Sequence, residues 1–382
     1  MSTYSARISR AREVMDRLGI DLLYLAPGAN AQYLSGWRRN RPHFGNVNYP
    51  GGWIQGLFVG LTRGPVLAVP RMVADFDLEP DTNLDVRALP DQGDPTAFLD
   101  GVLREFEPRL GAIAIENRAW SEQALALRQV RPDAEVRLAS EVLGPLRMIK
   151  APAELDLLER AAAIVDQTMT DIVSFLDPDS GQTELDVAYE IDRLMMRAGA
   201  DGSSFVTNVW QMGPGELRPL AMKASRRPLA RGNSLSFDFG ATFAGYCYDF
   251  GRSVHLGNPP DEYRRVHALV MRAAQIGIEA LQDGQHTAEE VDALARQVVV
   301  DGGYGEWFRH RLGHGIGLDV HEPPYLDRGD RSLLQRGMCF TVEPSIFIPG
   351  RFGARTEDVV VVGGAEGGRV LTHYRRDLQV VP

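Results

Sequence analysis

Two aspartates in one short stretch of the sequence have the spacing of metal-binding or acid–base residues. The stretch, residues 235–252, reads LSFDFGATFAGYCYDFGR. Side chains of an extended chain alternate between two faces, so Asp238 and Asp249 lie on the polar sides of two strands whose other sides are apolar. The glycine-containing break between the strands predicts a hairpin that buries one face and projects both aspartates from the other. The alternative is a pair of solvated aspartates on an exposed sheet.

Three later segments add residues of the kinds that bind metal ions. HRLGHGIGLDVHE, residues 310–322, holds three histidines in a glycine-rich turn. In CFTVEPS, residues 339–345, a glutamate leaves its strand on the polar side, and in RTEDVVVV, residues 355–362, another precedes a run of valines that predicts burial. The candidate residues of these segments are His310, His314, His321, Glu343, Arg355 and Glu357.

The carboxylates of all four segments could share one buried site only with cations. Two like charges about 4 Å apart repel by roughly 4 kcal/mol even at an effective dielectric of about 20, and burial adds a desolvation cost. Four carboxylates and one imidazole suit two divalent ions of the Mn, Co, Fe or Zn range, bridged by oxygen ligands. We therefore expect two divalent metal ions, with manganese as the first choice.

These segments resemble the pita-bread metallohydrolases, peptidase family M24, which include methionine aminopeptidase, aminopeptidase P, prolidase and creatinase. The matching stretches are DFGATFAGYCYDFGR, GHGIGLDVHEPPYL, TVEPSIF and RTEDVVVV, with LRMIKAPAELDLLERA at 146–161. They favour the prolidase and creatinase branch. The resemblance implies an α/β (α+β) fold with a creatinase-like N-terminal domain at 1–146 and a pseudo-twofold pita-bread catalytic domain at 147–382.

An internal repeat points to the same pseudo-twofold domain. Thr183 and Thr287 each precede an acidic residue by three positions, which is a capping-box pattern, and each follows a long amphipathic helix. The two aspartates fall in the first repeat, and His314, Glu343 and Glu357 fall in the second. We expect a site between two similar halves. A chance similarity of two helix caps is the alternative.

The resemblance also implies a role for each candidate ligand. Asp238 would bind one metal ion, and Asp249 and Glu357 would bridge both. His314 and Glu343 would complete the second ion. Water held by the two ions would be the nucleophile, and Glu343 would accept its proton.

Four more residues match family positions around the substrate. His310 and His321 would bind the substrate and stabilise the tetrahedral intermediate, although each could instead be a structural histidine. Arg355 would hold a substrate carboxylate or contact the acids of the site. Tyr246 matches a tyrosine near the ligands.

Two further segments bear on the substrate. Prolidases, aminopeptidases P and creatinase carry a histidine ahead of the first aspartate, but here that position is Leu220 in MGPGELRPLA. Xaa-Pro cleavage would then depend on a substitute such as Arg218, or on a substrate that does not need the proton donor. The segment 37–53 carries Arg41 and His43. It is either a solvated basic loop or a substrate-gating loop that reaches an anionic substrate in a homodimer.

Composition limits the remaining possibilities. The chain has 382 residues and a net charge of −10, which argues against nucleic acid or an anionic membrane as partner. No apolar run is long enough to span a membrane, and no signal peptide is apparent. Two cysteines fit reduced buried thiols, so we expect a cytoplasmic protein.

Three functions follow from these features. The first is a dinuclear hydrolase that cleaves a peptide or amide C–N bond, like an Xaa-Pro dipeptidase or aminopeptidase. The second, suggested by Leu220, is a creatinase-like or ectoine-hydrolase-like hydrolase, or a lyase, acting on a small non-peptide metabolite. The third is a catalytically silent binding module, which would be expected to lack some of the ligands.

Overall fold

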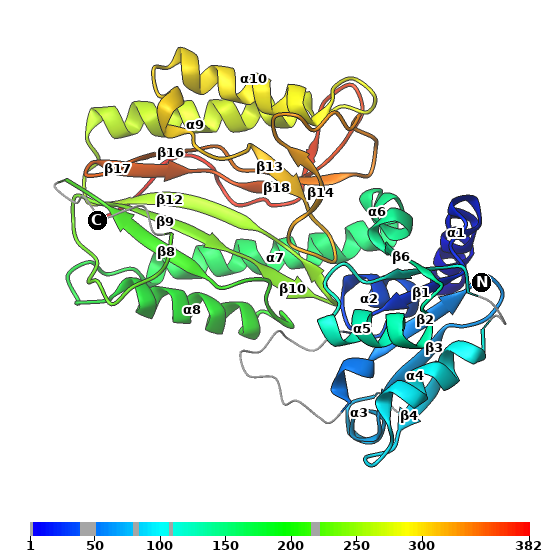
Figure 1. The fold of residues 1–382 in the computed structure, drawn as a ribbon. Helices are drawn as coiled ribbons and strands as arrows, with labels where there is room; N and C mark the ends of the chain where they lie inside the picture. The colour runs from blue at the N-terminus through cyan, green and yellow to red at the C-terminus, as the bar shows by residue number, and fades with distance from the viewer. Residues whose placement is uncertain (1–2, 39–50, 79–83, 107–109, 215–221) are drawn as a thin grey trace. The chain divides into compact units, whose positions relative to one another are not determined.

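The computed structural model describes residues 3–38, 51–78, 84–106, 110–214 and 222–382. The chain divides into two units, Met1–Arg147 and Met148–Pro382 (Figure 1). Each unit combines helices with one or more sheets, which confirms the mixed α/β class. Within the described ranges, no helix has both the length and the apolar character that a membrane crossing requires.

A mixed six-stranded sheet forms the centre of the first unit. Its strands are β1 (Leu22–Leu25), β2 (Gly56–Gly60), β3 (Val66–Pro70), β4 (Asp85–Leu89), β5 (Ala112–Ile115) and β6 (Glu135–Leu138). Its helices are α1 (Thr3–Leu18), α2 (Ala29–Ser35), η1 (Gly52–Ile54), α3 (Arg71–Phe76), α4 (Pro95–Arg104), α5 (Ser121–Val130) and α6 (Ser140–Met148). The strand order is β4-β3-β2-β1-β5-β6. The rings of Tyr24 and Phe58 stack at 4.3 Å between centroids and join the two central strands.

The second unit is built from long helices and four smaller sheets. Its helices are α7 (Pro152–Phe175), α8 (Glu184–Arg197), α9 (Asp261–Ala280), α10 (Ala288–Asp301) and η2 (Gly305–Trp307). The strands of the first half are β7 (Gly202–Ser203), β8 (Asn208–Met212), β9 (Ser234–Phe239), β10 (Ala241–Phe243), β11 (Tyr246–Cys247) and β12 (Phe250–Leu256). The later strands are β13 (Gly313–Gly315), β14 (Glu322–Leu326), β15 (Cys339–Val342), β16 (Ser345–Ile348), β17 (Phe352–Arg355), β18 (Asp358–Val361), β19 (Arg369–Val370) and β20 (Gln379–Val381).

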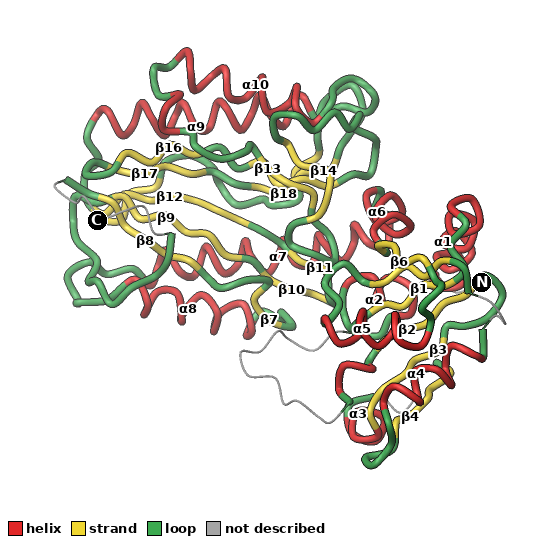
Figure 2. The backbone as a smooth tube through the Cα atoms, in the orientation of Figure 1, coloured by secondary structure: helices red, strands yellow, loops and turns green. Residues whose placement is uncertain are grey.

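The two halves of this unit repeat one arrangement. A helix pair precedes the strands in each half, with α7 and α8 on one side of the strand layer and α9 and α10 on the other (Figures 1 and 2). Both second helices begin with the expected cap. The Asp186 carboxylate accepts a hydrogen bond from the Thr183 N–H at 2.8 Å, and the Glu290 carboxylate accepts one from the Thr287 N–H at 2.7 Å.

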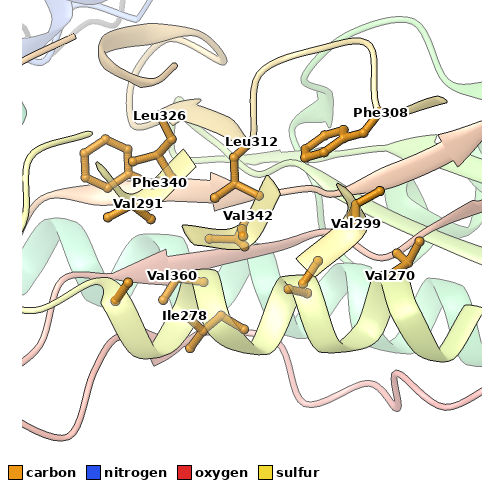
Figure 3. Packing of buried hydrophobic residues seen from close by; sticks show 14 of the residues in the cluster. Val270, Ile278, Val291, Val299, Phe308, Leu312, Leu326, Phe340, Val342 and Val360 are labelled. Carbon is orange, nitrogen blue, oxygen red and sulfur yellow. The ribbon is translucent and has the colours of Figure 1, made fainter. Parts of the chain in front are cut away.

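Apolar side chains of α9 and α10 pack against the strands of the second half (Figure 3). The helix residues recur every three or four positions, so one face of each helix is buried. The packed side chains include Val270, Ile278, Val291, Val299, Phe340, Val342 and Val360. Through Leu312, Phe340, Val342 and Val360 this core supports β15, β18 and the residue before β13, and these strands contain or adjoin the second-half candidate ligands.

Strands of the two halves cross at Gly251 and Glu357, in addition to the parallel pairing of β12 with β20. The Gly251 N–H donates to the Glu357 carbonyl at 3.4 Å, and the Glu357 N–H donates back at 2.9 Å. A Cβ on Gly251 would lie 2.6 Å from Glu357 Oε2, so the close approach requires glycine. Beside the crossing, the buried Arg252 donates to the Glu357 carbonyl at 2.7 Å and pairs with the buried Asp358 at 2.7 Å.

Both cysteines of the chain are buried thiols that form no disulfide, as the sequence predicts. Cys247 lies in β11 and Cys339 begins β15. Burial raises the pKa of the Cys339 thiol to about 12, so this side chain stays protonated and packs as a small apolar group.

We expect Arg252→Met to destabilise the protein by about 3 kcal/mol, because the buried Asp358 then keeps only the partly exposed Arg376 as its counter-charge. Chemical denaturation of the metal-free protein measures this effect. The control is Arg231→Met, which breaks an exposed ion pair with Asp179 and should change the free energy of unfolding by less than about 1 kcal/mol. An equal decrease in the free energy of unfolding of both variants would contradict a stabilising role for the Arg252–Asp358 pair at the crossing.

Candidate metal centre

Two strands of the first half carry the aspartates. Asp238 lies in β9, and Asp249 comes directly before β12. The strands pair antiparallel, with Asp238 opposite Gly251. The face that carries both side chains is polar but buried, since Asp249 is 4% exposed and Ser236, two positions before Asp238 on β9, is 1% exposed. The structure therefore disagrees with the alternative of solvated aspartates on an open sheet.

The second half supplies the other three candidate ligands from strand ends. His314 is the middle residue of the short β13, Glu343 follows β15, and Glu357 precedes β18. A Cβ on Gly313 would lie 1.8 Å from the Thr341 carbonyl oxygen, so glycine allows β13 to approach β15 closely. The Thr341 hydroxyl accepts the His314 N–H at 3.0 Å and donates to Glu343 Oε1 at 3.2 Å.

Donor atoms of these residues form overlapping groups that could each hold a metal ion. His314 Nε2 lies 3.5 Å from Asp249 Oδ2 and 3.4 Å from Glu343 Oε1. Within each group, one ligand atom per residue lies within 4.8 Å of the others. The groups are Asp238–Asp249–Glu357, His314–Glu343–Glu357 and Asp249–His314–His321. Asp249, His314 and Glu357 each belong to two of them. A carboxylate has two oxygens and could bind two ions at once, so Asp249 and Glu357 are the residues that could lie between neighbouring metal positions.

The chemistry of the donor atoms fits metal ions. Asp249 Oδ1 and Glu357 Oε2 are buried and accept no hydrogen bond from any of the described residues. A buried carboxylate oxygen that accepts no hydrogen bond is costly. Oxygen-rich sites with one imidazole suit divalent ions, so bound cations would satisfy both oxygens.

Arg355 is the positive charge inside the acidic cluster. Its guanidinium lies 2.5 Å from Asp238 Oδ2, 2.9 Å from Glu343 Oε2 and 3.4 Å from Glu357 Oε2. The side chain is only 5% exposed. The sequence leaves it open whether Arg355 binds a substrate carboxylate or contacts the acids of the site. In the structure its guanidinium contacts the acids.

The pKa values show that one arginine does not neutralise the cluster. Burial raises the pKa of Asp238 to about 6 even beside Arg355, and neighbouring carboxylates add to this increase. Burial and the charge of Asp249 raise the pKa of Glu357 well above its ordinary value. Burial also acts to raise the pKa of Glu343, but Arg355 and His314 outweigh it, so this pKa is lowered.

The other two histidines lie in different surroundings. The His321 ring is 3.9 Å from the His314 ring between centroids, and an Arg311 guanidinium nitrogen lies 3.4 Å from His321 Nδ1. His310 donates through Nδ1 to the Arg311 carbonyl at 2.7 Å, so in the neutral ring Nε2 accepts from the Ser345 hydroxyl. Burial lowers the pKa of both His310 and His321.

The remaining predicted substrate contacts fall elsewhere. Tyr246 is 5% exposed, and its hydroxyl donates to Glu154 Oε1 at 2.8 Å, which ties β11 to the first turn of α7. Arg41, His43 and Arg218 lie outside the described residues, as does Leu220.

Two residues near the histidines are not among the sequence predictions. Arg311 packs its guanidinium 4.7 Å from the centroid of the Tyr325 ring and also reaches His321. Ser345, directly after the Glu343–Pro344 pair, contacts His310. Only their position in the sequence could have pointed to these two residues. Arg311 directly follows His310, and Ser345 lies two positions after Glu343.

Comparisons with known proteins agree for both units. Residues 156–363 match the family described as Metallopeptidase family M24. Residues 7–149 match the family described as Creatinase/Prolidase N-terminal domain. The chain is 33% identical over 384 residues to a probable dipeptidase PepE of Mycobacterium tuberculosis, covering 99% of this chain and 97% of that protein. It is 32% identical over 365 residues to an Xaa-Pro dipeptidase of Lactobacillus helveticus, covering 95% of each.

Solved structures show the same similarity. A prolidase from Thermococcus sibiricus superposes with a TM-score of 0.88 at 30% identity and covers 100% of both chains. The dipeptidase PepE of Mycobacterium ulcerans has a TM-score of 0.84 at 32% identity, covering 100% of this chain and 98% of that chain.

We expect metal affinity to fall steeply below pH 6. A metal ion must displace the proton that Asp238 holds in the metal-free protein below its pKa of about 6, and the raised pKa of Glu357 adds to this competition. Affinity should drop by about tenfold per pH unit for each displaced proton. Calorimetric titration of Mn²⁺ at pH 7.5 and pH 5.5 measures this change. Equal affinity at the two pH values would contradict binding to these carboxylates.

Proposed function

The chain belongs to metallopeptidase family M24 and is thus a metal-dependent peptidase, and on this premise we propose that it is a dinuclear dipeptidase acting on Xaa-Pro dipeptides. The observation that carries the proposal is the overlap of the ligand groups at Asp249 and Glu357. Each of these carboxylates has two oxygens and belongs to two groups, so each could bind two neighbouring ions at once. The substrate class is proposed from the dipeptidases that this chain resembles over nearly its full length.

We propose manganese as the physiological metal, with cobalt, zinc and iron as the other candidates. The donor set supports this choice, because four carboxylates and one imidazole form a mostly oxygen site. A homodimer is proposed from the family resemblance, and light scattering in solution tests it.

The side chains around the ligands support peptide hydrolysis. Bound metal ions would supply Lewis acidity to a carbonyl group and lower the pKa of water. Glu343 has a lowered pKa, so it is ionised at neutral pH and can accept a proton. A guanidinium can only donate hydrogen bonds, so Arg311 donates to His321 Nδ1 and neutral His321 holds its own proton on Nε2. From there His321 can donate a hydrogen bond to the substrate carbonyl oxygen.

The free carboxylate of a dipeptide needs a cation, and we propose Arg311 for this role. Arg355 is buried and already contacts three carboxylates. Arg311 is partly exposed and stacks on Tyr325. It also lies beside His321, whose ring packs against the ring of the proposed metal ligand His314. An arginine fork matches a carboxylate in charge and shape.

Metal content and turnover should be lost together when a shared ligand is removed. We expect Asp249→Ala and Glu357→Ala to lose at least one ion per chain by elemental analysis and to lose Xaa-Pro turnover in a Mn²⁺-supplemented assay. The control Asp301→Ala removes an exposed carboxylate and should change neither. A fully metallated and active Glu357→Ala variant would contradict the assignment. A metallated wild type without dipeptide turnover would favour a small non-peptide substrate.

The carboxylate role of Arg311 can be separated from catalysis with two substrates. We expect Arg311→Gln to raise KM for an Xaa-Pro dipeptide by about 10- to 100-fold, since hydrogen bonds to charged groups contribute about 1.5–3 kcal/mol. KM for the corresponding dipeptide amide should change little. Arg309→Gln is the matched control, because Arg309 is exposed and its guanidinium stacks on Trp307. Equal losses on the acid and the amide would mean that Arg311 acts only through His321.

A further inference from the structure

A buried ion pair lies directly behind the turn that carries His321. Lys150 Nζ is 2.6 Å from Glu322 Oε1, and the two side chains are 2% and 8% exposed. Glu322 follows His321 in the chain and begins β14. Lys150 lies in the short segment before α7, 172 positions away in sequence.

The backbone around Lys150 is fixed to the strand that leads to Glu343. Lys150 N–H donates to the Gly337 carbonyl at 2.9 Å, and Ile149 bridges to Met338. Met338 directly precedes β15, and Glu343 directly follows it. The ammonium group also donates to the Met148 carbonyl at 3.3 Å. The ion pair therefore connects the His321 turn to the strand of a metal ligand.

The turn itself is shaped to accommodate the pair. A Cβ on Gly317 would lie 2.8 Å from Glu322 Oε1 and 3.0 Å from Lys150 Cε. Both atoms belong to a buried ion pair with little room to move, so glycine is required. The Gly317 carbonyl accepts the Cys247 N–H at 2.7 Å, which attaches the turn to β11.

Stability alone is a poor explanation for this pair. Burying two charges costs as much as their attraction returns in many proteins, and apolar replacements of a whole pair are often neutral or stabilising. Groups behind a functional histidine instead act by fixing its orientation. The Lys150–Glu322 pair has the location for this role, since Glu322 and His321 share one peptide bond.

We propose that Lys150 is a positioning residue for catalysis. Its ion pair with Glu322 fixes the backbone of the His321 turn, so that the His321 ring stays against His314 and Arg311. The proposal rests on the proposed peptidase function for its kinetic consequence. Its structural consequence, the fixed orientation of His321, does not depend on the substrate.

A double-mutant cycle tests the proposal with Mn²⁺-saturated enzyme. Lys150→Met should lower kcat by about 10- to 100-fold at unchanged metal content, and the loss should vanish in a His321→Ala background. The variant Lys150→Met/Glu322→Gln removes both charges and should regain thermal stability but not kcat. Lys223→Met, the same change at an exposed lysine, is the control. The proposal would be overturned if the kcat losses of Lys150→Met and His321→Ala were additive. It would also be overturned if Lys150→Met/Glu322→Gln regained kcat together with thermal stability.

A second measurement does not depend on turnover. In imidazole NMR spectra of the wild-type chain, the His321 signals are identified by their loss in His321→Ala. We expect them to shift or broaden in Lys150→Met and to stay unchanged in Lys223→Met. Unchanged His321 signals in Lys150→Met would overturn the proposal. A wild type that binds metal but cleaves no dipeptide would contradict the proposed function alone, because the NMR result would still decide the role of Lys150.

Discussion

Repulsion among four buried carboxylates is the constraint on which the catalytic unit depends. Asp238, Asp249, Glu343 and Glu357 converge from strand ends in both halves of the unit, and Arg355 offsets only part of their charge. Burial, together with the charges of the neighbouring carboxylates, raises the pKa values of Asp238 and Glu357 despite Arg355. The close strand approaches at Gly251 and Gly313 hold these groups together against that repulsion.

Much of this arrangement could be predicted because its signals are local. Alternation along β9 predicts that Asp238 lies on one face of the strand and the neighbouring aromatic residues on the other. The helix caps at Thr183 and Thr287 mark the beginning of the second helix in each half. The edge strands β4 and β6 were not anticipated. Their side chains are largely exposed and include charged residues, so they lack the apolar alternation that identifies a strand.

Contacts between distant segments could not be predicted in the same way. The sequence leaves two roles open for Arg355, because its choice between a substrate and the acids depends on strands that meet only in the fold. Tyr246 matched a position near the ligands, yet its hydroxyl reaches Glu154, 92 positions earlier. Lys150 and Glu322 show no local pattern that links them. The stretch with Leu220 lies outside the described residues.

The crossing of Gly251 and Glu357 has a consequence for how metal binding and folding of the unit depend on each other. Each half supplies an incomplete ligand set, two aspartates from the first and three residues from the second. Two of the three candidate ligand groups combine residues of both halves, so neither half could form them alone. An ion bound at either of these groups would stabilise the contact between the halves together with the backbone hydrogen bonds of the crossing, and the metal would act as part of the folded framework.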